Sequence, residues 1–96
     1  MEINELIEKS HCLAKEKGFW DNYRPISECL MLIVTELAEA CEADRRGDER
    51  NFNEEIADTF IRLGDLCGYL EIDIEKEINA KIKINKRRPY KHGKCY

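Results

Sequence analysis

Two pairs of acidic residues stand out in this sequence because of their type and spacing. Glu36 and Glu39 lie three residues apart, and so do Glu55 and Asp58. On a helix this spacing places both carboxylates of a pair on one face, about 5–6 Å apart at Cβ. Carboxylate oxygens suit hard cations such as Mg2+ and Mn2+, and Mg2+ is usually shared between carboxylates and phosphates. If the two helices are neighbours, the four acids predict a divalent-metal site for phosphate chemistry.

Four helical segments are expected to position these acids. They are residues 2–17, the stretch from Ser27 to about Arg46, residues 54 to 69 or 70, and the stretch from Asp73 to about Lys86. Ser27, Asn53 and Asp73 are the expected N-caps, because their side-chain oxygens can accept hydrogen bonds from N–H groups of the first turn. Gly47 is expected to end the second helix. Residues 18–25 are expected to form a loop.

Apolar residues recur with helical spacing on the two acid-bearing segments. The stripe on the second segment consists of Leu30, Ile33, Val34, Leu37 and Cys41, and that on the third of Ile56, Phe60, Leu63, Cys67 and Leu70. These stripes are expected to face the core, with both acid pairs at its rim. Gly64 lies inside the third segment, where glycine costs about 1 kcal/mol relative to alanine, and therefore suggests close packing at that point.

Length and composition restrict the fold and the partners. The 96 residues make one domain, with an irregular basic tail at 88–96. With 43% hydrophobic and 38% charged residues and only two prolines, the chain is expected to be all-α, and so small a domain often gains stability by oligomerising. The net charge of −4 argues against stable nucleic-acid binding. No apolar run is long enough to cross a membrane, so a cytoplasmic location is expected.

Two polar residues interrupt the apolar face of the fourth segment. Lys81 and Asn85 share the sector of its isoleucines and therefore need polar partners. The four acids, or a phosphate-bearing ligand between them, would supply these partners. His11, in contrast, lies on a highly charged segment and is expected to face solvent.

The order of these residues resembles that of the MazG-like nucleotide pyrophosphohydrolases, which belong to the all-α NTP pyrophosphatase superfamily. The likeness runs from about residue 11 to residue 94 and rests on ExxE, then ExxD after fifteen intervening residues, then KxxxN and RPYKHGK. Thr35 is a difference, because the family often carries a further glutamate at the start of the first motif. The resemblance implies a four-helix bundle-like subunit that assembles into a homodimer or homotetramer with active sites near subunit interfaces.

The resemblance also implies an activity, the hydrolysis of a ribo- or deoxyribonucleoside triphosphate to the monophosphate and pyrophosphate. Glu36, Glu39, Glu55 and Asp58 would hold Mg2+, or Mn2+, which would activate a water for attack on the α-phosphorus. Glu36 or Glu39 would accept the proton of that water. Lys81 would neutralise charge on the phosphates during catalysis.

The other residues carried over from the family would bind the substrate. Trp20 or Tyr90 would stack on the base, and Asn85 would hydrogen-bond to the sugar or a phosphate. The basic residues of the tail that would hold the leaving pyrophosphate are Arg88, Lys91 and Lys94.

Three alternatives stay open. A related pyrophosphatase could act on phosphoribosyl-ATP or a modified nucleotide. A non-catalytic helical module could bind a nucleotide or a protein and respond to ligand only by a shift in melting temperature. An RNA-binding adaptor using the basic tail would show salt-sensitive affinity, which the acidic body disfavours.

Overall fold

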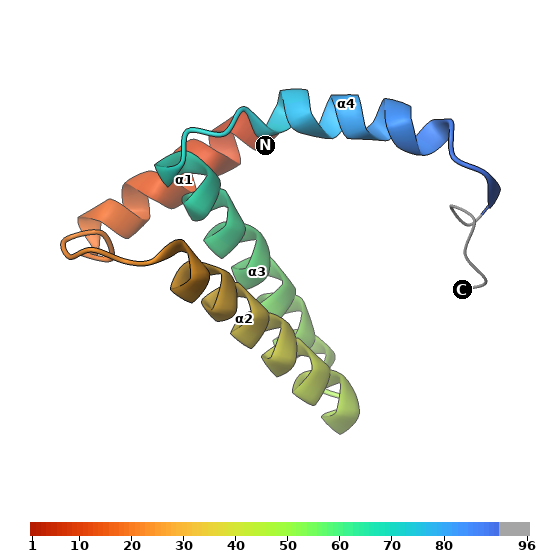
Figure 1. Ribbon diagram of the computed structural model, residues 1–96. Helices are drawn as coiled ribbons and strands as arrows, with labels where there is room; N and C mark the ends of the chain where they lie inside the picture. Colours follow the sequence, from red (N-terminus) through yellow and green to blue (C-terminus); the bar gives the residue numbers. More distant parts are fainter. Residues whose placement is uncertain (91–96) are drawn as a thin grey trace.

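The computed structural model describes residues 1–90, and this part of the chain is entirely helical (Figure 1). Its helices are α1 (Ile3–Glu16), α2 (Ile26–Arg46), α3 (Glu49–Tyr69) and α4 (Ile74–Lys86). The expected all-α class and the four segments are confirmed. Within residues 1–90, no helix combines the length and the low charge that crossing a bilayer would need.

The helix boundaries confirm two of the expected capping residues and correct two others. The Asp73 side chain accepts a hydrogen bond from the Lys76 N–H at 3.3 Å, and Gly47 ends α2 in the left-handed conformation with φ of 70°. The predictions for Ser27 and Asn53 were wrong. Helix α2 begins directly after Pro25, whose φ of −61° suits the entry to a helix.

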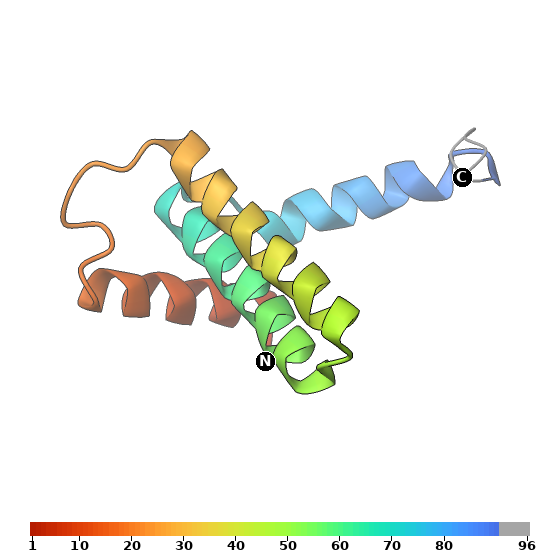
Figure 2. The ribbon, with the colours of Figure 1, turned by 90° about the horizontal axis from the view of Figure 1, so that it is seen from below.

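The start of α3 differs because a stronger cap lies upstream of Asn53. Asp48 accepts a hydrogen bond from the Asn51 N–H at 3.0 Å, so α3 begins at Glu49. The loop between α2 and α3 is therefore only two residues long, Gly47 and Asp48. A loop this short forces the two helices to run antiparallel and side by side, as Figures 1 and 2 both show.

Helix α1 packs across α3 at two glycines, which confirms the close packing expected at Gly64. A Cβ atom added at Gly64 would lie 3.3 Å from Ser10 Oγ, and one added at Gly68 would lie 2.7 Å from His11 Cβ. A larger residue at Gly68 would therefore force α1 and α3 to shift, whereas one at Gly64 would need only a small displacement of Ser10. These glycines fix the position of α1, and with it the loop that leads to α2.

The apolar face of α2 is rotated relative to the expected core. The residues of α2 that are buried are Ile33, Glu36, Ala40 and Ala43. Leu30, Val34, Leu37 and Cys41 are exposed instead, so the prediction that they face the core was wrong. Small alanines allow α2 and α3 to approach closely, which leaves the larger apolar side chains on the outside of the pair.

The corresponding stripe on α3 is divided between the core and the surface. Cys67 is buried as expected and Ile56 is partly buried, whereas Phe60, Leu63 and Leu70 are exposed. Phe60 is 61% exposed. Together with the outward residues of α2, Phe60 and Leu63 leave much of the large apolar surface of this helix pair uncovered within the chain.

Helix α4 extends away from the α2–α3 pair (Figures 1 and 2). Its beginning lies beside the beginning of α1, where the Asn4 side-chain amide donates to Glu75 Oε2 at 3.5 Å. No residue of α4 is buried, and Ile78 and Ile82 of its apolar face are exposed. Thus α1, α2 and α3 pack together, and α4 projects from them.

Candidate metal centre and adjoining cavity

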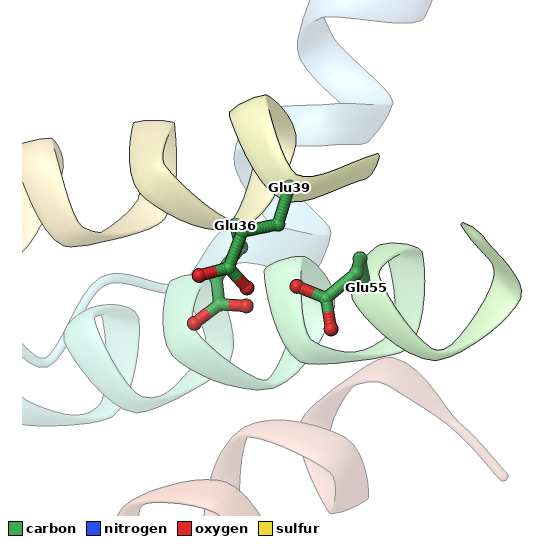
Figure 3. A group of neighbouring side chains, drawn as sticks. All are labelled: Glu36, Glu39 and Glu55. Carbon is green, nitrogen blue, oxygen red and sulfur yellow. The ribbon is translucent and has the colours of Figure 1, made fainter. Parts of the chain in front are cut away.

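Three acidic side chains converge between α2 and α3. Glu36 and Glu39 come from α2 and Glu55 comes from α3, and each can place a carboxylate oxygen within 4.8 Å of the other two (Figure 3). The antiparallel pairing of the helices brings Glu55 opposite the two acids of α2. Glu36 and Glu55 are each only 8% exposed, whereas Glu39 is exposed. The structure thus brings together three of the four acids expected to hold a metal.

The convergence of three acids raises the pKa of the Glu55 carboxyl group. A hydrogen bond with the Glu39 carboxyl, burial, and the negative charges of Glu39 and Glu36 together raise the pKa of Glu55 to about 7. The Oε2 atom of Glu55 is also buried, with no hydrogen-bond partner among residues 1–90. A buried carboxylate oxygen without a partner is costly, and a bound cation would relieve both this cost and the repulsion.

Glu36 also forms an ion pair with an arginine side chain of α3. Arg62 Nε donates to Glu36 Oε1 at 2.8 Å, and the Glu36 side chain is 11% exposed. Arg62 thus offsets part of the negative charge of the cluster and fixes the orientation of Glu36. The Arg62–Glu36 pair joins the acid cluster to the cavity next to it.

A cavity of about 250 Å³ adjoins the cluster and runs between α1, α2, α3 and the loop before α2. Its lining residues are Ser10, Leu13, Ala14, Phe19, Trp20, Arg24, Cys29, Leu32, Glu36, Asp58, Ile61, Arg62, Asp65 and Leu66. Asp58 is exposed and lies along this cavity, outside the group of three acids within 4.8 Å. Glu36, Asp58 and Arg62 therefore form the polar side of the cavity, and aromatic residues line another part of it.

Trp20 lies in the cavity wall and is fixed by residues of α3. Its ring stacks on that of Tyr69, with centroids 3.9 Å apart and 4° between the planes. Its Nε1–H donates to Asp65 Oδ1 at 2.9 Å. The loop that carries Trp20 is thereby fastened to α3, about three helical turns beyond Glu55.

Asp65 also contacts His11, which corrects the expectation that His11 faces solvent. His11 Nδ1 lies 2.9 Å from Asp65 Oδ1, and both side chains are largely buried, at 19% and 18% exposure. The His11 ring also meets those of Trp20 and Tyr69 edge to face. Asp65 Oδ1 thus accepts hydrogen bonds from the rings of His11 and Trp20, which lie 54 and 45 positions away in the sequence.

The sequence analysis missed the roles of Arg62 and Asp65. Asp58, Arg62 and Asp65 follow a spacing of four and then three residues, which places them on one face of a helix. That spacing could have identified a polar face continuing from the acids toward Trp20. Nothing in the local sequence indicates that His11, 54 positions away, meets Asp65.

The described residues of α4 and the segment after it that were expected to bind the substrate lie neither in the acid cluster nor in the cavity wall. Lys81 and Asn85 belong to α4, and Arg88 and Tyr90 follow it, on the element that projects from the other helices (Figure 1). The Oδ1 atom of Asn85 is buried, with no hydrogen-bond partner in the part of the chain that the structure describes. Lys91 and Lys94 lie outside the described residues.

Comparison of this chain with protein-family models, with curated proteins and with solved structures finds no match.

Proposed function

We propose that this protein is a Mg2+-dependent nucleoside triphosphate pyrophosphohydrolase, which cleaves a ribo- or deoxyribonucleoside triphosphate to the monophosphate and pyrophosphate. The observation that carries the proposal is the convergence of Glu36, Glu39 and Glu55 within 4.8 Å, next to a cavity lined with aromatic residues. The first feature suits a divalent cation and the second a nucleobase. The order of motifs along the sequence independently favours the same chemistry.

The donor set of the cluster fits Mg2+ and also Mn2+. It consists only of carboxylate oxygens, and one of them, Glu55 Oε2, is buried without a partner among the described residues. Glu36, Glu39 and Glu55 would hold the ion, and Asp58 lies along the same edge of the cavity. When bound, Mg2+ neutralises phosphate charge and makes water more acidic.

Each acid has a distinct part in this proposal. Glu36 has one oxygen engaged by Arg62, whereas Glu39 is exposed to solvent. We therefore assign Glu39 the task of accepting the proton from the attacking water and Glu36 that of orienting the ion. Asp58 lines the cavity together with Glu36, on the side where the phosphates would enter.

The cavity would hold the base rather than the complete substrate. Its volume of about 250 Å³ is below the roughly 300–1,000 Å³ typical of pockets for drug-sized ligands. A base beside Trp20 would direct the phosphates past Asp58 toward Glu36 and Glu39. The cavity wall thus offers polar residues for the phosphates and aromatic residues for the base.

Within residues 1–90 of one chain, α4 carries Lys81 away from the acids, so we propose that a second copy supplies this cation for the outer phosphates. Lys81 and Asn85 lie on the projecting α4, on whose apolar face Ile78 and Ile82 are exposed. The outer face of α2 and α3 is also apolar and uncovered, with Val34 50% and Phe60 61% exposed. A homodimer, or a homotetramer built from two dimers, would cover these surfaces and bring Lys81 of one copy to the acids of another.

Mixing two inactive variants tests this shared site. The Glu39→Gln and Lys81→Ala proteins are unfolded together and refolded at equal amounts. Random pairing makes about half of the dimers mixed, and each mixed dimer holds one intact site, so about a quarter of wild-type activity is expected. The control is each variant refolded without the other, so that both copies in every dimer carry the same substitution. Failure of the mixture to exceed the controls would show that Lys81 acts within its own chain.

The activity itself is tested by release of pyrophosphate from a panel of ribo- and deoxyribonucleoside triphosphates with Mg2+. Glu39→Gln and Glu55→Gln are expected to abolish turnover, whereas Glu54→Gln, on the solvent side of α3 and paired with Arg50 at 3.5 Å, should keep it. Absence of pyrophosphate release from every nucleotide would refute the proposed reaction.

The Glu36–Arg62 ion pair favours a second candidate, a helical module that binds a nucleotide without cleaving it. In this case Arg62 would partly replace the cation that a catalytic cluster needs. Such a module would raise its melting temperature with nucleotide and Mg2+ but release no pyrophosphate. A nucleotide-dependent shift without product would therefore support the binding module.

A further inference from the structure

The wall of the cavity contains a carboxylate, Asp65, that the proposed chemistry does not use. Asp65 lines the cavity, and its Oδ1 atom accepts hydrogen bonds from Trp20 Nε1–H and His11 Nδ1–H, each at 2.9 Å. Both lone pairs of Oδ1 are therefore occupied. The second oxygen, Oδ2, remains as the acceptor that Asp65 can offer to a ligand.

The neighbours of Asp65 keep it in this orientation. Trp20 stacks on Tyr69 at 3.9 Å, and His11 meets the same two rings edge to face. The two ring N–H groups hold the Asp65 carboxylate in place. Because an ionised carboxylate carries no hydrogen, Asp65 can only accept a hydrogen bond from a ligand. At this part of the cavity wall, a ligand thus meets a hydrogen-bond acceptor beside an aromatic surface.

We propose that Asp65 is a specificity-determining residue that selects nucleobases bearing an exocyclic amino group, namely cytosine, adenine or guanine, over their carbonyl counterparts. The inference rests on the proposed function in that it takes the ligand to be a nucleotide. An exocyclic amine donates to Asp65 Oδ2 while the base lies beside Trp20. The cavity of about 250 Å³ admits a base of this size.

Uracil and thymine are rejected by the same carboxylate. The amino group of cytosine is replaced in them by a carbonyl oxygen, which would face Asp65 Oδ2 with no proton between the two acceptors. Their ring N–H lies between two carbonyl groups, so its approach to Asp65 brings a carbonyl oxygen with it. A buried polar group left without its partner is the strongest source of discrimination between similar ligands.

The test compares nucleotides that differ only at this group. Calorimetry with Mg2+ measures the affinity for CMP against UMP and for AMP against IMP, each as the ribo- and deoxyribonucleotide. The amino-bearing member of at least one pair is expected to bind about tenfold more tightly or better. Asp65→Asn should reduce this preference several-fold, because its amide can still accept from Trp20 and also donate to a carbonyl. Asp21→Asn, a change of the same type on the exposed loop, should keep the preference.

The outcomes separate this inference from the proposed reaction. Equal affinities within both pairs, together with equal release of pyrophosphate from CTP and UTP, would overturn the role of Asp65 while leaving the reaction intact. A preference for the amino-bearing base that Asp65→Asn removes, without any release of pyrophosphate, would support the role of Asp65 and refute the reaction. A preference that survives Asp65→Asn would assign base selection to other residues and overturn the inference.

Discussion

Binding of Mg2+ is expected to compete with a proton on Glu55. The pKa of this carboxyl is raised to about 7, chiefly by its hydrogen bond with Glu39, and then by burial and the charges of Glu39 and Glu36. Because a metal binds the ionised form, apparent affinity scales with the ionised fraction. Protonation of Glu55 lowers the apparent affinity for Mg2+ by a factor of 1 + 10^(7 − pH), which is about 1.1 at pH 8 and about 11 at pH 6. The apparent affinity for Mg2+ is thus expected to fall about tenfold from pH 8 to pH 6.

Calorimetric titration with Mg2+ at pH 6, 7 and 8 measures this dependence. At pH 6, where most Glu55 is protonated, buffers of different ionisation enthalpy should reveal the release of nearly one proton per bound ion. Glu55→Gln should bind more weakly and with little dependence on pH, and Glu54→Gln should behave like the wild type. Equal affinity at pH 6 and pH 8, or a tenfold dependence that persists in Glu55→Gln, would refute the assignment of the raised pKa to the metal cluster.

The same pKa determines how the metal-free protein responds to pH. Because the folded-state pKa of Glu55 lies above its ordinary value of 4.5, its contribution to stability is complete below about pH 4.5 and is lost as the pH rises through 7. Thermal unfolding without metal should therefore show this contribution of Glu55 decreasing between pH 4.5 and 7. Comparison with Glu55→Gln isolates it, since the difference in melting temperature between the two proteins should change across this range and level off above pH 7.

Three further outcomes follow from the packing. Gly68→Ala places a Cβ 2.7 Å from a Cβ on α1 and should lower the free energy of unfolding by about 1–3 kcal/mol in urea titrations, more than Gly64→Ala, whose nearest contact is a hydroxyl at 3.3 Å. Arg62→Gln leaves the buried Glu36 without its cation, so metal-free stability should fall by about 1–3 kcal/mol while Mg2+ affinity rises, and an unchanged affinity would contradict the role of Arg62 as a competing cation. Phe60→Lys, at an exposed apolar position, should shift sedimentation toward the monomer with helix content unchanged.

The helices and the meeting of three acids could be predicted from sequence because both depend on local geometry. Spacing of three residues puts Glu36 and Glu39 on one side of α2, and a short connection makes the next helix run back alongside it. Asp73 and Gly47 were recognised as caps for the same reason, since a cap depends on neighbouring residues. Asn53 was chosen wrongly as a cap because its side chain is equally suitable in type, whereas Asp48 comes immediately after Gly47 and caps the helix five residues earlier.

The rotation of α2 could not be predicted, because periodicity identifies an apolar face without identifying what covers it. Val34 and Leu37 satisfy the helical pattern equally well against α3 or against another chain. Ala40 and Ala43 are weak contributors to such a pattern, yet their small size permits the close approach of α3. The contact between His11 and Asp65 was beyond reach for a different reason, since it depends on the path of α1 over Gly64 and Gly68.

The stacking of Trp20 on Tyr69 gives the protein an intrinsic optical probe. The chain contains one tryptophan, so its emission comes entirely from the wall of the cavity. The Trp20 indole donates to Asp65, which also contacts His11. A ligand that enters the cavity and alters these contacts should therefore change the emission of Trp20. Occupancy of the cavity can therefore be followed by fluorescence in the unlabelled protein, in stopped-flow experiments as well as at equilibrium.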